Sequence, residues 1–161
     1  MSQPGYVDHI CSVLDYQHEK DTHTPLPVSL QLNCQSASID ITAFRQILGL
    51  LNHLAIHTRP DIIYGMSILA AHTANPTQYH MDLAMRILSY VKTTQTLGIT
   101  FTSNGPIQLF GHADASYNCH DDARSHTGLS YTIGTNTAAF HSRSSKQKML
   151  LAHQQKQYYM H

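Results

Sequence analysis

Charged residues are scarce in this sequence. They make up 12% of its 161 residues, about half of the usual quarter. Lys plus Arg and Asp plus Glu number ten each, so no overall positive field indicates a nucleic-acid-binding protein, although a local basic patch stays compatible with this composition. No Asp or Glu follows Asp122, which leaves the last part of the chain without a carboxylate side chain for catalysis or metal binding.

Cysteine pairs and long apolar runs are lacking as well. Cys11, Cys34 and Cys119 are widely spaced and form no CxxC pair, a pattern typical of free thiols in a reducing compartment. No window reaches about 18 consecutive apolar residues, and the N-terminus has no basic segment followed by an apolar run. We therefore expect an intracellular protein, cytoplasmic or nuclear, that is neither secreted nor inserted in a membrane.

The apolar residues that are present make up 42% of the chain, which indicates a folded protein of one ordinary domain or two small ones. Their spacing predicts a short helix over residues 4–16. Residues 17–39 are polar and contain two prolines, a composition typical of a linker or long loop.

Three helices are expected between residues 40 and 94, where apolar side chains recur at three- and four-residue spacing. Asp40 or Thr42 is the expected N-cap of the first helix. The second should begin at Pro60, a residue that suits the first helical position. For the third we expect Asn75 as the cap and Pro76 at the first position. These helices should form a compact unit.

After Gly98 the apolar period changes from helical to alternating, which predicts strands. We expect them at 99–102, 109–117, 129–133 and 138–142, with turns between them. A further helix is expected to begin near Met149, and the chain stops inside it, so we expect a truncated domain. The sequence therefore predicts an α+β fold, with a helical part followed by a partial antiparallel sheet.

Histidine is abundant, with 13 residues. His53 and His57 lie four residues apart on an expected helix, a spacing at which two imidazoles can share a zinc ion. A third ligand is not evident and no HExxH motif is present, so a structural or exposed role is favoured over metal binding. A second group surrounds the expected strands and matches no standard ligand spacing: His112, Cys119, His120, His126 and His141.

Several motifs follow one another in a distinctive order: TRPDI (58–62), NPTQYH (75–80), RILSYVKTTQTLGITF (86–101), HADASYN (112–118), RSHTG (124–128) and SRSSKQK (142–148). Their order and spacing resemble those of copia-type retrotransposon polyproteins, and the resemblance covers nearly the whole chain. In that family these motifs span the end of the reverse transcriptase, its connection and the beginning of ribonuclease H.

The resemblance implies three parts. Residues 1–39 would be the end of the reverse transcriptase, a thumb-like segment and linker, and 40–98 a helical connection. Residues 99–161 would be an incomplete ribonuclease H-like domain. The parent activities would be RNA-directed DNA synthesis and hydrolysis of the RNA–DNA hybrid. The paired aspartates of the polymerase palm are absent, since Asp121–Asp122 is a loop pair and not a YxDD turn.

By the same resemblance, Asp114 matches the first metal-binding aspartate of ribonuclease H, where two Mg²⁺ ions assist hydrolysis. The family continues into a helix with glutamates. An alignment without gaps places Lys156 and Tyr158 at those positions, and a shift of one residue places Gln155 and Gln157 there. Mg²⁺ requires several hard oxygen ligands. We therefore expect Asp114 to be a catalytic remnant, with no productively bound Mg²⁺ and no activity in this chain alone.

The resemblance also implies a binding partner, an RNA–DNA hybrid or another nucleic acid of the retroelement. Four basic residues around the expected sheet can contact the phosphates of an RNA–DNA hybrid, although a solvated strand rim is equally compatible with them: Arg124, Arg143, Lys146 and Lys148. An open sheet edge also predicts self-association. The alternative to an inactive polyprotein fragment is therefore a non-catalytic binding module, derived from such an element, for nucleic acid or protein.

Overall fold

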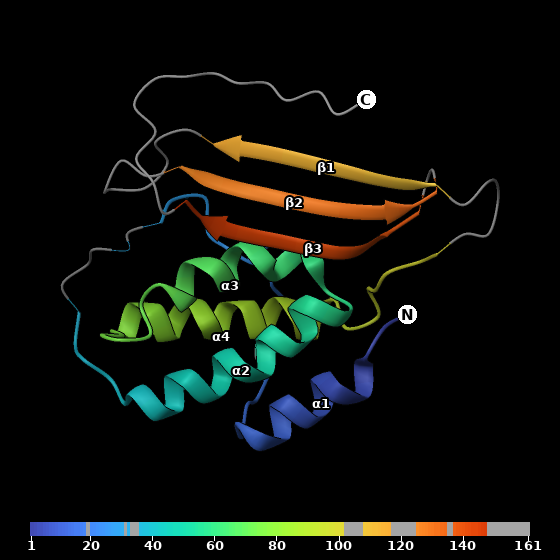
Figure 1. Ribbon diagram of the computed structural model, residues 1–161. Helices are drawn as coiled ribbons and strands as arrows, with labels where there is room; N and C mark the ends of the chain where they lie inside the picture. The colour runs from blue at the N-terminus through green and yellow to red at the C-terminus, as the bar shows by residue number, and fades with distance from the viewer. Residues whose placement is uncertain are drawn as a thin grey trace.

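A computed structural model describes most of the chain. The described residues are 1–18, 20–30, 32, 36–101, 108–116, 125–134 and 137–147. Within them, helices come first and strands last (Figure 1). The order is α1 (Pro4–Val13), α2 (Ile41–His57), the 3-10 helix η1 (Pro60–Ile62), α3 (Ile63–Ala70), α4 (Gln78–Thr93), β1 (Leu109–Ser116), β2 (His126–Ile133) and β3 (Ala139–Lys146).

The described part is a mixed α+β structure, as the sequence predicts. The strands form one antiparallel sheet in the order β1-β2-β3. In Figure 1, β3 lies beside α3, and β1 is the strand farthest from the helices. The helix expected from Met149 lies outside the described residues.

The helix starts follow local capping chemistry. The Asp40 carboxylate accepts the Thr42 N–H at 2.9 Å, so Asp40 and not Thr42 caps α2. Such a bond satisfies one of the N–H groups that a helix start leaves without a backbone partner. Pro60 begins a helical stretch as expected, but its first turn is η1 and α3 follows directly.

The predicted cap of α4 is wrong by two residues. The cap is Thr77 and not Asn75, and Pro76 lies buried before the helix instead of in its first turn. The reason is the side chain of His80, whose Nδ1 accepts the Thr77 backbone N–H at 3.0 Å and lies 2.9 Å from the Thr77 hydroxyl. This contact replaces the expected proline start.

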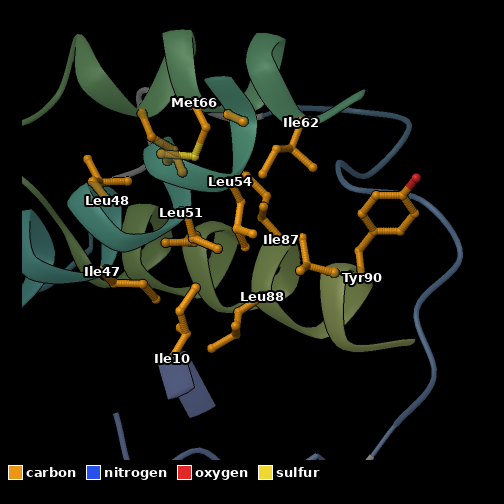
Figure 2. Close-up of a cluster of buried hydrophobic side chains, with 14 of the residues drawn as sticks. Ile10, Ile47, Leu48, Leu51, Leu54, Ile62, Met66, Ile87, Leu88 and Tyr90 are labelled. Carbon is orange, nitrogen blue, oxygen red and sulfur yellow. The ribbon is translucent and has the colours of Figure 1, made fainter. Parts of the chain in front are cut away.

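The main apolar core lies between the helices (Figure 2). Side chains from α2 and α4 face each other, η1 and α3 close one side, and Ile10 of α1 enters from another. Each of these large side chains contributes about 1.5–3 kcal/mol when fully buried. The largest fully buried ones are Ile10, Phe44, Ile47, Leu51, Leu54, Ile62, Leu69, Ile87, Leu88 and Val91.

The strands differ from those predicted. Residues 99–101, the described part of the strand expected at 99–102, belong to no strand; Ile99 N–H instead donates to the Met1 carbonyl at 2.9 Å. β2 begins at His126 and not at residue 129, and β3 continues to Lys146 and not to residue 142. The added residues, 126–128 of β2 and 143–146 of β3, are mostly polar. They belong to the strands because they pair with each other, from His126 with Lys146 onward. The buried His126 ring also packs edge-on against Tyr64 of α3, with ring centroids 5.2 Å apart. Alternation of apolar residues cannot reveal a strand end whose side chains are polar.

The first prediction concerns the helical core. Leu51→Ala should lower the free energy of unfolding by about 2–5 kcal/mol, because Leu51 is fully buried between helices and the lost methyl groups leave a cavity. Ile56→Ala in the same helix should cost about 1 kcal/mol or less, because Ile56 is 57% exposed. Urea unfolding monitored by circular dichroism measures both variants. Equal losses would contradict this position of the core.

Candidate functional site

Asp114 lies near the end of β1, on the strand farthest from the helices (Figure 1). Its side chain is exposed, and its backbone partner across the ladder is Gly128. His112, two residues earlier, belongs to the same sheet face because strand side chains alternate. The strand therefore presents one carboxylate and one imidazole together.

Both residues line a groove of about 340 Å³, here named the Asp114 groove. It lies between the sheet and the beginning of the η1–α3 stretch. Its walls combine residues that are far apart in the sequence, so no local motif could have predicted it. The helical side consists of Pro60, Asp61, Ile63 and Tyr64, and the sheet side of residues 112–114, 128–130 and 142–144.

Asp61 is the other carboxylate of the Asp114 groove, but its oxygens are already engaged. Arg59 donates to them from Nε at 3.1 Å and from Nη2 at 2.8 Å, and the Tyr90 hydroxyl donates at 2.7 Å. Burial alone would raise the pKa of Asp61, but the bonds from Arg59 and Tyr90 and the Arg59 charge outweigh it and lower that pKa. Asp61 is thus held as an ionised partner of Arg59.

The Arg59 network is a feature that sequence reasoning did not identify. Arg59 is only 3% exposed, although Arg is almost never buried without a partner. Besides Asp61, it donates from Nη1 to the Thr94 carbonyl at 3.0 Å and from Nη2 to the Thr94 hydroxyl at 2.7 Å. The only local signal was the TRPD sequence, which places an acid two residues after the arginine.

These residues do not fit a two-magnesium site. Such a site needs several anionic oxygens directed at two ions about 4 Å apart. The Asp114 groove offers Asp114 together with Asp61, whose carboxylate is bound to Arg59. Within the described ranges, no group of three or more His, Cys, Asp or Glu side chains could hold a metal ion.

The predicted basic patch is divided by the strand register. Arg143 pairs with Leu129, which pairs with Ala113, whereas Asp114 pairs with Gly128 and Lys146 with His126. Because paired residues share a sheet face and neighbours alternate, Arg143 belongs to the opposite face from Lys146. Two further predicted contacts, Arg124 and Lys148, lie outside the described residues.

Lys146 acts electrostatically on the helical part. Burial lowers the pKa of His72, just after α3, and the positive charge of Lys146 lowers it further. His72 in turn stacks on His80, with ring centroids 4.2 Å apart. Burial lowers the pKa of His80 as well, and the charge of His72 adds to that effect. Protonation of His72 and of His80 is therefore disfavoured.

Among the described residues, the histidines of the sheet do not form one cluster. His112 lines the Asp114 groove, whereas His126 is buried and shares a 2.5 Å hydrogen bond with the Ser144 hydroxyl. His141 pairs with Tyr131 on the other face and contacts its ring. Cys119 and His120 lie outside the described residues.

Comparison with known proteins gives three informative relatives. An uncharacterized mitochondrial protein of Arabidopsis thaliana is 31% identical over 145 residues, which are 89% of this chain and 60% of that protein. The retrovirus-related Pol polyprotein from transposon RE1 of the same plant is 30% identical over 91% of this chain but only 10% of its own length. A secreted RxLR effector protein of Plasmopara viticola is 31% identical over 63% of this chain and 70% of its own length.

The RE1 polyprotein and further transposon proteins match over most of the chain, so the class is that of retrotransposon proteins. The chain belongs to the copia-type retrotransposon Pol polyprotein family, as its motif order predicts. It spans 60% of the mitochondrial relative and about a tenth of the Pol polyproteins. No family model and no solved structure matches it.

None of the described helices is both long enough and apolar enough to cross a membrane. The expected intracellular location stays a prediction, and the name of one relative describes a secreted effector.

The second prediction concerns the Arg59 network. Arg59→Ala should lower the free energy of unfolding by about 1–3 kcal/mol, because it leaves the Thr94 carbonyl without its donor, while Asp61, which is 36% exposed, keeps the hydrogen bond from Tyr90. Arg45→Ala is the matched control: Arg45 is exposed and makes one 3.4 Å hydrogen bond, so the cost should be about 0.5 kcal/mol or less. Urea unfolding of both variants measures the difference, and a loss no larger for Arg59 would show that the network is dispensable.

Proposed function

We propose that this chain is a catalytically inactive part of a copia-type reverse transcriptase and ribonuclease H region. In this proposal residues 1–39 derive from the end of the reverse transcriptase, 40–98 from its connection and 99–161 from the beginning of ribonuclease H. Family membership and the order of helices before strands support these assignments. The parent domain of residues 99–161 would hydrolyse the RNA strand of an RNA–DNA hybrid.

One observation carries the proposal of inactivity. In this proposal Asp114 derives from the first metal-binding aspartate of ribonuclease H; it lines the Asp114 groove, while Asp61 in the same groove is bound to Arg59 and Tyr90. The sequence after Asp122 contains no carboxylate side chain that could complete the set. A single free carboxylate cannot replace the water shells of two Mg²⁺ ions or position an attacking water between them.

The third prediction follows from this inactivity. The purified chain, incubated with a short RNA–DNA hybrid and Mg²⁺ or Mn²⁺, should leave the RNA strand intact, and Asp114→Asn should behave identically. An active ribonuclease H added to the same substrate is the positive control. RNA cleavage that disappears in Asp114→Asn would overturn the proposal, because contaminating nuclease would survive that substitution.

The alternative, a non-catalytic binding module, has its own supporting observation. Among the described strands, β1 and β3 are the two edges of the sheet, and three apolar side chains near them are exposed: Leu109 by 68%, Ile133 by 43% and Phe140 by 44%. Exposed edges of this kind favour pairing with another chain. Light scattering on the purified chain measures whether it self-associates through these edges, which would favour this alternative.

Nucleic-acid binding would also favour the alternative. The exposed Arg143 is the described cation best placed to meet a phosphate from the sheet. If hybrid binding occurs, fluorescence anisotropy at increasing salt should show a falling affinity, and Arg143→Gln should reduce the salt slope by about one. Affinity that does not depend on salt would exclude a phosphate-binding role for this residue.

A further inference from the structure

The last turn of α2 carries two neighbouring imidazoles on the protein surface. His53 and His57 are both exposed, and their ring centroids lie 4.2 Å apart with the planes inclined by 31°. They are not part of the Asp114 groove, whose lining includes no residue of α2. Residues four apart on a helix lie one above the other on the same face, so the two rings can approach one ion together.

The tautomer of His57 is fixed by its hydrogen bond. Nδ1 of His57 lies 2.7 Å from the backbone carbonyl oxygen of His53. A carbonyl oxygen only accepts, so Nδ1 carries the proton and donates. In the neutral ring the lone pair is then on Nε2. Metal-binding histidines are commonly oriented in this way, with the other ring nitrogen donating to a backbone carbonyl.

The ring of His53 is also restrained. Tyr6 of α1 packs against it with ring centroids 4.7 Å apart, so His53 lies between Tyr6 and His57. A restrained ligand loses less conformational freedom when an ion binds. Both histidines lie near the carboxyl end of α2. This end of a helix carries partial negative charge, which favours the binding of a cation.

We propose that His53 and His57 form a two-histidine site for a divalent transition-metal ion that prefers imidazole, with water in the remaining coordination positions. Cu²⁺ should bind most tightly, because affinity at nitrogen sites rises along the first-row series to copper and falls again at zinc. Since no described group of three or more such ligands exists, the site is open and the ion exchangeable. Mg²⁺ is not a candidate, because it prefers oxygen ligands.

Binding of the ion should stabilise the end of α2. The two ligands span one helical turn, directly before Thr58 and the buried Arg59. An ion that holds both rings binds the folded helix in preference to the extended chain, so it should raise the unfolding temperature, and the increase should grow with the ion concentration relative to the dissociation constant.

The fourth prediction tests this site with Cu²⁺ on the full chain. Isothermal titration should reveal one tightest site per chain, and the EPR spectrum of the first equivalent should show two nitrogen ligands. His53→Gln and His57→Gln should each weaken this binding by about tenfold or more, because either change removes the chelate. The double variant should be little weaker than either single variant, because the chelate is lost only once.

His23→Gln is the matched control. His23 is exposed and distant from α2 in sequence, so its loss should leave the tightest Cu²⁺ binding unchanged. Thermal unfolding gives an independent readout: Cu²⁺ should raise the midpoint of the wild-type chain and of the control, but not that of the two α2 variants. Unchanged tight binding in His53→Gln and His57→Gln, or equal loss in His23→Gln, would place the ion elsewhere and overturn the proposal.

Discussion

Arg59 donates five hydrogen bonds from a side chain that is almost completely buried, and these bonds connect three segments of the chain. Asp61 belongs to η1, Thr94 follows α4, and Arg59 itself follows the end of α2. A buried guanidinium without these partners would be strongly destabilising. The pairing therefore determines how the chain turns from α2 into η1 and where that turn meets the end of α4.

The same contact shapes the Asp114 groove. α3 begins immediately after η1 and lies beside β3, so the position of η1 determines which residues face the sheet (Figure 1). Asp61 reaches the groove, but its carboxylate is committed to Arg59 and Tyr90. A group that could have served as a second acidic ligand acts instead as a structural anion. Asp114 is left without a neighbouring free carboxylate among the described residues of the groove.

Local patterns predicted much of this fold, and their failures have a common cause. The apolar spacing of α2, α3 and α4, the Asp40 cap and the alternation in the sheet depend on neighbours along the chain, so the sequence reveals them. The start of β2 depends on Lys146 and Tyr64, which contact His126 from distant parts of the chain. The burial of Arg59 depends on Thr94, 35 residues later. The Thr77 cap required a histidine in a role usually taken by Glu or Gln.

The site could be predicted only in part. Motif order identified the family and drew attention to Asp114. The predicted strand ended at residue 142, however, so the sequence did not show that Arg143 and Lys146 share β3 and belong to opposite sheet faces. The central claim is that Asp114 lacks the partners of a two-metal site. The most direct test is the EPR spectrum of Mn²⁺ added to the chain together with an RNA–DNA hybrid. We predict the spectrum of isolated, weakly held ions, unchanged in Asp114→Asn; an exchange-coupled Mn²⁺ pair that disappears in Asp114→Asn would contradict the claim.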